Sequence, residues 1–414
     1  MIGALKRSAL LAPFQVRSFR FQFPADLLTS WGTEMENLVL GWYILVETGS
    51  VLLLSLFWAL QYLGTLLAPL MGMAGDRLGH RAILCAMRVV YAVLAVVLMT
   101  LAFTGLLRPL HVFVIATLSG LVRPSDQTMR NALIAETLPP DRLMATMGVS
   151  RTTQDSARIA GSLAGAGLFA LFGMGWVYLA ISVFYAAGVL LTLGVGGRRY
   201  RTAVAGPPVW RDLVEGLAYV WDTPVSLASI WLALLVNLTA FPLTSGLLPY
   251  VARDIYHIDQ TGLGTLVASF ALGSFAGSIL VSLTGRLLRP ARMMLVFAVA
   301  WYALLLVFAQ MPGPEGGRVA LVLAGVAQAL SLVPMSVLLL HSAGERFRGR
   351  VMGVRTLAIY GVPPGLLAAG LLIDRIGFAA TVWVYCLVGV ALTALIALRW
   401  RADLWPLSAP ANAR

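Results

Sequence analysis

The chain has 414 residues, of which 59% are hydrophobic and only 12% are charged. Because soluble domains carry about 25% charged residues, this composition and a mean hydropathy of +0.85 exclude a large soluble core and predict an all-α integral membrane protein. The net charge of +12 does not indicate nucleic-acid binding, because the arginines fall in short clusters between apolar runs.

We predict twelve membrane-spanning helices, because the apolar runs reach the ~20 residues that a helix needs to cross a bilayer. In chain order the predicted helices cover residues 19–45, 51–72, 82–103, 110–135, 143–172, 176–196, 225–251, 261–284, 293–310, 318–341, 351–373 and 378–398. A polar segment with Pro207 and Pro208 follows the sixth helix. We therefore expect an N-terminal six-helix bundle at 1–197, a cytoplasmic linker at 198–223, and a C-terminal six-helix bundle with a short tail at 224–414.

Basic residues between the predicted helices are unevenly distributed over the two sides of the membrane. The arginines on the poorer side are Arg108, Arg253, Arg318 and Arg375. The richer side includes the N-terminal arm with Lys6 and Arg7 and the tail with Arg399 and Arg401. Since loops rich in Lys and Arg stay in the cytoplasm, both termini are predicted to be cytoplasmic. We expect a multi-pass protein of the bacterial inner membrane.

The two halves of the chain share a short sequence repeat. Met-Gly-Val-Ser-Arg-Thr at 147–152 opens the fifth predicted helix, and Met-Gly-Val-Arg-Thr at 352–356 opens the eleventh. The equivalent position of the two segments in each half favours two related bundles with a substrate path between them.

The most specific pattern lies between the second and third predicted helices. It reads Gly72-Met-Ala-Gly-Asp76-Arg77-Leu-Gly79-His80-Arg81. This charged, glycine-punctuated turn resembles the loop between helices 2 and 3 of the major facilitator superfamily. Every defining position matches except His80, where the family usually has Arg or Lys. The resemblance implies the major facilitator fold and a transporter that moves a small solute across a membrane.

The same resemblance implies a gating role for this turn, which would hold the outward-facing state together. The residues concerned are Gly72, Asp76, Arg77, Gly79 and Arg81. Near a helix end, Asp76 is placed to cap a neighbouring helix or to pair with an arginine. Gly72 and Gly79 would allow close backbone approach and a tight turn. The alternative is a charged loop that only sets topology.

Further patterns resemble one branch of the superfamily, the twelve-span drug and siderophore exporters of the proton-antiporter type. They are Leu-Gly-Trp-Tyr at 40–43, Asn-Ala-Leu-Ile at 131–134 and Glu-Gly-Leu-Ala-Tyr-Val at 215–220. The segment 157–162 resembles an antiporter pattern that ends in Gly-Pro, but Ser162 replaces the proline. The resemblance implies proton-coupled export of an amphipathic or cationic solute. Ser162 leaves open a facilitated lipid or siderophore transporter without strict proton coupling.

Acidic residues within the first predicted helix are candidates for the proton and substrate site. A charge near the bilayer centre costs at least ~2.5 kcal/mol, so it normally faces a wet cavity. Asp26 and Glu34 lie about 80° apart around the helix and two turns apart along it, and multidrug antiporters of the superfamily can carry such pairs. Burial disfavours a charged carboxylate, so we expect Glu34, assisted by Asp26, to carry the proton. Glu36 faces elsewhere and either takes part or pairs with a basic residue.

Four further polar residues complete the candidate set, and three of them are ionisable. Asp126 and Arg130 have the i, i+4 spacing of a helix salt bridge, and Arg158 is expected to pair with Asp126 or Glu34. Structural ion pairing that fixes helix register is the alternative role for all of them. Since the C-terminal half has almost no internal charge, its cavity should be apolar with polar tips, among them Asn237.

The sequence contains no nucleotide loop, metal-ligand cluster or nucleophile–base pair. We therefore expect no enzymatic activity and no cofactor, with the proton gradient as the driving force. The expected partners are a small-molecule substrate and the lipid bilayer, with no nucleic acid, and the protein is expected to be a monomer. A polytopic receptor or enzyme would leave the repeat unexplained.

Overall fold

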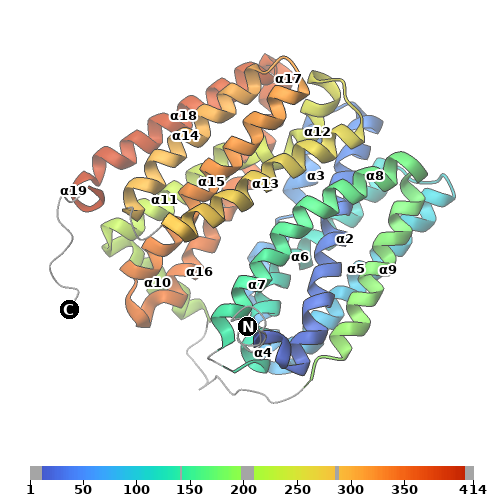
Figure 1. Ribbon diagram of the computed structural model, residues 1–414, viewed down its shortest axis with the longest axis horizontal. Helices are drawn as coiled ribbons and strands as arrows, with labels where there is room; N and C mark the ends of the chain where they lie inside the picture. Colours follow the sequence, from blue (N-terminus) through green and yellow to red (C-terminus); the bar gives the residue numbers. More distant parts are fainter. Residues whose placement is uncertain (1–11, 140–141, 197–208, 285–288, 406–414) are drawn as a thin grey trace, which may run out of the picture. The chain divides into compact units, whose positions relative to one another are not determined.

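The computed structural model describes residues 12–139, 142–196, 209–284 and 289–405, and every regular element in these ranges is a helix (Figure 1). The predicted all-α class is therefore confirmed. The chain divides into two compact units. The N-terminal unit holds the helices up to α9 (Met174–Leu193), except that Leu54–Leu56 group with the C-terminal unit. The C-terminal unit holds the helices from α10 (Val209–Asp222) onward, except that Ile258–Ala268 group with the N-terminal unit.

The N-terminal unit is built from six long helical segments, drawn from blue to green in Figure 1. Four of them, α2, α5, α6 and α9, are unbroken, and the other two change helix type along their length. The elements are η1 (Ala12–Gln15), α2 (Arg17–Thr48), α3 (Val51–Leu60), η2 (Leu63–Leu67), α4 (Ala68–Leu78), α5 (His80–Phe103), α6 (Pro109–Thr137), α7 (Leu143–Ser156), η4 (Ala157–Gly161), α8 (Ser162–Phe172) and α9 (Met174–Leu193). They follow the first six predicted spans in order.

The C-terminal unit also contains six long helical segments, preceded by the amphipathic helix α10. Its elements are α10 (Val209–Asp222), α11 (Pro224–Thr239), η5 (Pro242–Gly246), α12 (Leu248–Tyr250), η6 (Val251–Ile255), α13 (Gln260–Thr284), α14 (Pro290–Gln310), α15 (Pro314–Ser342), α16 (Gly344–Leu357), η7 (Ala358–Gly361), α17 (Val362–Ile376), α18 (Phe378–Arg399) and α19 (Arg401–Leu404). Helix α10 occupies the second half of the predicted linker at 198–223 and packs on α16.

The charged segment between the second and third predicted helices is also more helical than expected. Helix α4 continues to Leu78 and α5 begins at His80, so only Gly79 interrupts them. Gly79 has a φ of +92°, a conformation that glycine adopts without a Cβ clash. The sequence indicated a turn because Gly and charged residues cluster here, but they occupy the last turn of one helix and the first turn of the next.

The sequence repeat marks the same local structure in both units. Segment 147–152 lies in α7 and segment 352–356 lies in α16, and each of these helices ends in a short non-α turn. The turn is a π-helix at Ala157–Gly161 in the first unit and a 3₁₀-helix at Ala358–Gly361 in the second. In both units an α-helix follows this turn, so the structural similarity extends beyond the residues that match in sequence.

Within the described residues, eight helices are long and apolar enough to cross a membrane. Two of them, α5 and α9, belong to the N-terminal unit, and the other six belong to the C-terminal unit. The remaining predicted spans fall on α2, on α3 with α4, on α6, and on α7 with α8. These four segments are interrupted or contain more polar residues, and α2, α6 and α7 with η4 supply most of the residues that line the candidate site.

Candidate functional site

A cavity of about 340 Å³ lies inside the N-terminal unit. This volume is within the ~300–1,000 Å³ range of small-molecule pockets. Its walls come from α2, α5, α6, α7 and η4, and they are mainly polar or charged. The lining residues are Ser30, Thr33, Glu34, Tyr91, Arg123, Asp126, Gln127, Arg130, Gln154, Asp155, Ala157 and Arg158. Four of the predicted site residues therefore line one cavity: Glu34, Asp126, Arg130 and Arg158.

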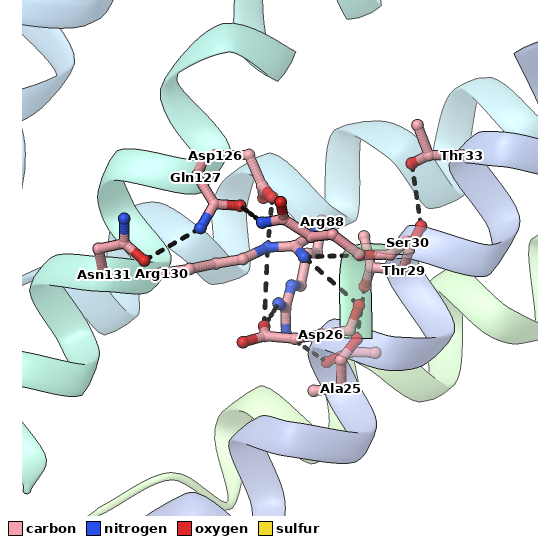
Figure 2. Close-up of polar contacts among 12 residues, drawn as sticks. Ala25, Asp26, Thr29, Ser30, Thr33, Arg88, Asp126, Gln127, Arg130 and Asn131 are labelled. Carbon is pink, nitrogen blue, oxygen red and sulfur yellow. Dashed lines mark hydrogen bonds and ion pairs between the residues drawn. The ribbon is translucent and has the colours of Figure 1, made fainter. Parts of the chain in front are cut away.

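Asp26 lies at the centre of a buried ion-pair cluster, which Figure 2 shows. Its carboxylate pairs with Arg88 of α5, and the Arg130 Nε lies 3.7 Å from the same carboxylate oxygen. Arg130 also pairs with Asp126, as the i, i+4 spacing predicted, and it donates a 2.8 Å hydrogen bond to Ser30 Oγ. Asp26 is thus held by two arginines instead of facing the cavity as a free acid.

Arg88 joins this cluster to a fourth helix. Its guanidinium donates to Thr192 Oγ1 and, at 3.4 Å, to the Gly188 carbonyl oxygen, both on α9. The side chain is completely buried, and a buried charge is tolerated only when it is paired and hydrogen-bonded. We did not identify Arg88 from the sequence, although an arginine within an apolar run is a signal that it needs a buried partner.

Glu36 lies in a second ion-pair cluster of the same unit. It pairs with Arg123 of α6 and accepts a 2.8 Å hydrogen bond from the Tyr185 hydroxyl of α9. Arg123 also donates 2.8 Å hydrogen bonds to Asn37 Oδ1 and Gln61 Oε1. Of the two roles left open for Glu36, the structure shows pairing with a basic residue.

The two clusters together contain equal numbers of opposite charges. Their acids are Asp26, Glu36 and Asp126, and their bases are Arg88, Arg123 and Arg130. Three negative groups against three positive groups leave no net charge. This balance allows six ionisable side chains to remain inside a unit that sits in lipid.

Glu34 differs from the other acids of α2. Among the described residues its carboxylate accepts no hydrogen bond and forms no ion pair within 4.0 Å, and it lines the cavity. Arg158 and Arg123 are the positive charges whose field acts on it. The guanidinium of Arg158 likewise forms no hydrogen bond or ion pair with a described residue, so neither of the expected pairs, with Asp126 or with Glu34, is formed.

Backbone geometry places Arg158 on the wall that Glu34 also lines. Arg158 lies in the π-helical turn η4, and such turns often occur at functional sites. At the end of the turn, a Cβ added to Gly161 would lie 3.2 Å from the Trp31 carbonyl oxygen and 3.1 Å from the Glu34 Cβ. Glycine therefore allows η4 to approach α2 closely. Ser162, which replaces the proline of the resembled pattern, donates a 2.6 Å hydrogen bond to the Arg158 carbonyl oxygen.

None of the described side chains of the predicted gating turn lines this cavity. The side chain of Asp76 is outside the described part of the structure, and Arg77 is exposed on the last turn of α4. Arg81 donates a 2.8 Å hydrogen bond to the Val195 carbonyl oxygen beyond α9. A Cβ at Gly72 would meet no described atom within 4 Å, so the close approach expected there is not seen.

His80, the position that departs from the family pattern, has a specific partner. Its Nδ1 lies 2.9 Å from Glu136 Oε1 near the end of α6. Helix α5 is therefore tied to α6 through His80 and to the end of α9 through Arg81. The contacts seen at this turn lie within the N-terminal unit.

Asn237 belongs to the C-terminal unit and lines a separate cavity of about 250 Å³. Its Nδ2 donates a 3.1 Å hydrogen bond to the Ala358 carbonyl oxygen in η7. Met335 and Phe241 supply apolar lining, and Arg355 and Thr356 supply polar lining. The lining is therefore partly apolar, and its charged residue Arg355 was not among the residues expected there.

Comparison with known proteins agrees with this architecture. The model of the Major Facilitator Superfamily matches residues 23–366. The chain is 25% identical over 371 residues to the Multidrug efflux pump Tap of Mycolicibacterium fortuitum, covering 86% of this chain and 89% of that protein.

Solved structures show the same fold at low sequence identity. A bacterial homolog to the human lysosomal transporter Spinster aligns with a TM-score of 0.70 and 15% identity, covering 95% of this chain and 99% of that chain. A POT family transporter in complex with 5-aminolevulinic acid aligns with a TM-score of 0.71 and 13% identity, covering 94% and 97%. A D-xylose-proton symporter aligns with a TM-score of 0.66 and 13% identity, covering 91% and 96%. Identities this low establish a common fold and carry no substrate with them.

Proposed function

Because the chain belongs to the Major Facilitator Superfamily, a family of membrane transporters and not of enzymes, we propose that it exports small amphipathic or cationic solutes in exchange for protons. The observation that carries this proposal is the Glu34 carboxylate on the wall of a polar cavity, which has no hydrogen-bond or ion-pair partner among the described residues. The similarity to a multidrug efflux pump supports export as the direction of transport.

The charge balance around the cavity explains why Glu34 is the preferred coupling residue. Protonating Asp26 or Glu36 would leave Arg88 or Arg123 buried without its close counter-charge, which is costly. Protonating Asp126 would leave Arg130 with only Asp26, 3.7 Å away. Protonating Glu34 breaks no ion pair among the described residues. A proton and a cationic solute can therefore compete for this one carboxylate.

Competition at Glu34 gives an exchange cycle. When the cavity opens to the acidic outer side, a proton neutralises Glu34 and a bound cation is released. When the cavity opens to the cytoplasm, the proton leaves and the negative charge attracts the next cation, more strongly than in water because the local dielectric constant is low. Between these states the field of Arg158 partly compensates the ionised carboxylate.

The test is Glu34→Gln in proteoliposomes with an imposed pH gradient and a cationic dye as the transported probe. We expect gradient-driven dye accumulation to be lost, because glutamine cannot exchange a proton. Glu47→Gln is the matched control, since Glu47 is an exposed acid at the other end of the same helix. Glu47→Gln should keep full gradient-driven transport. If Glu34→Gln keeps it as well, the coupling group lies elsewhere, and Asp126 or Glu36 becomes the next candidate.

A facilitated transporter of lipids or siderophores is the second candidate. Ser162, in place of the proline of the antiporter pattern, favours it. An ionophore that collapses the pH gradient separates the two, because it stops net accumulation by an exchanger and leaves downhill movement through a facilitator unchanged.

We also propose that the protein lies in the bacterial inner membrane with both termini in the cytoplasm. The bias of arginines towards one side supports this orientation. A reporter fused after Arg401 should give a cytoplasmic signal, and one fused after Gly105 a periplasmic signal. A periplasmic signal after Arg401 would contradict the orientation.

A further inference from the structure

A second concave surface lies on the outside of the C-terminal unit, between α11 and α18. The groove has a volume of about 380 Å³ and is walled by leucine and isoleucine side chains of both helices, including Leu238, Leu392 and Leu395. Both helices are long and apolar enough to span a membrane. The groove shares no residue with the cavity around Glu34.

The groove has one polar end. Successive spans alternate in direction, so α11 and α18, the first and last spans of this unit, run in opposite directions. Trp231 is the lining residue nearest the start of α11, and Arg399 and Trp400 come from the end of α18. These three residues therefore gather at the same end. Tryptophan is typical of the lipid–water interface, where arginine extends its guanidinium towards the headgroups.

The charge at this end is positive. The Arg399 guanidinium lies 5.6 Å from the centre of the Trp400 ring. The next residue in the chain, Arg401, is exposed. Asp403 is the acid of the short helix α19 that follows. No carboxylate lines the groove itself. An apolar channel that ends at an arginine and two tryptophans has the shape and charge of a site for one chain of an anionic amphiphile.

We propose that this groove binds an anionic phospholipid of the surrounding membrane, with an acyl chain between α11 and α18 and the phosphate at Arg399. The leucine walls accept the chain of any lipid, whereas Arg399 and Arg401 favour a headgroup with net negative charge. The lipid would bridge the first and last spans of the C-terminal unit.

The test compares phosphatidylglycerol with phosphatidylcholine of the same acyl chains, bound to the delipidated full-length protein and counted by native mass spectrometry. We expect phosphatidylglycerol to be retained more strongly. Arg399→Gln should weaken its binding roughly fivefold, the effect of one basic residue at a membrane surface. Arg375→Gln is the control, because Arg375 is an exposed arginine in the last turn of α17 that does not line the groove.

A second variant tests the acyl-chain part of the groove. Leu395 is 59% exposed, so Leu395→Trp should fill the groove without disturbing the core. We expect this variant to lose phosphatidylglycerol although it keeps both arginines, while its circular dichroism spectrum stays unchanged. The proposal is overturned if the wild-type protein retains both lipids equally. It is also overturned if Arg399→Gln and Leu395→Trp bind phosphatidylglycerol as the wild type does, or if Arg375→Gln loses as much as Arg399→Gln.

Discussion

The two units bury polar groups in different ways although they repeat the same helical plan. In the N-terminal unit, α2, α5, α6 and α9 are joined by charged pairs such as Asp26–Arg88 and Glu36–Arg123. In the C-terminal unit the corresponding links are neutral, for example the 2.6 Å hydrogen bond between Thr239 and Tyr302. Its described ion pairs lie elsewhere: Arg350–Glu215 joins α16 to α10, Arg211–Glu215 lies on α10, and Arg318–Glu315 lies near the start of α15.

In the proposed mechanism, the N-terminal unit carries the acid that exchanges a proton, and buried ion pairs surround that acid. Neutral hydroxyl bonds stabilise helix packing without any dependence on pH. Three predictions test whether the buried charges of the N-terminal unit contribute more to stability than the neutral bonds of the C-terminal unit.

The largest expected effect is that of Arg88→Met. The substitution keeps an unbranched apolar stem but removes the guanidinium, so Asp26 is left with only the more distant Arg130. Removing one partner of a buried pair costs about 3–5 kcal/mol of unfolding free energy, which unfolding in mixed micelles with sodium dodecyl sulfate would measure. The double variant Asp26→Asn/Arg88→Met should recover part of this loss. A cost below about 1 kcal/mol would show that the pair is no stronger than a neutral bond.

A smaller loss is expected for Glu36→Gln. The glutamine still reaches Tyr185, and Arg123 keeps its hydrogen bonds to Asn37 and Gln61. We expect a loss of about 1.5–3 kcal/mol, the contribution of a hydrogen bond to a charged group, measured by the same unfolding experiment. Glu47→Gln on the exposed end of α2 should leave stability unchanged. A loss no larger than that of this control would mean that Arg123 does not need a counter-charge.

The smallest effect is expected for Tyr302→Phe in the C-terminal unit. It removes the hydroxyl that Thr239 contacts, while Thr239 keeps its 2.8 Å bond to the Leu235 carbonyl oxygen. The loss should be about 1 kcal/mol, as for a typical neutral hydrogen bond. The same micelle titration measures it, and a loss equal to that of Arg88→Met would remove the contrast between the two units.

Much of the plan was visible in the sequence because it depends on local order. Apolar runs of membrane-spanning length predicted the helices, and the number and position of charges predicted a polar N-terminal half. Helix geometry placed Glu34 and Glu36 about 200° apart on α2. In the structure one of them lines the cavity and the other is buried against α6 and α9.

The tertiary structure alone decided which of the acids of α2 has no partner among the described residues. Asp26 and Arg88 are 62 positions apart, and Glu36 and Arg123 are 87 apart, so no periodicity links them. The π-helical turn at Arg158 was also invisible, because it forms where Gly161 packs against α2. Local spacing fixes the direction of each side chain around its own helix axis. Its partner depends on how separate helices pack, and burial of charge then selects the arrangement in which most of the opposite charges meet.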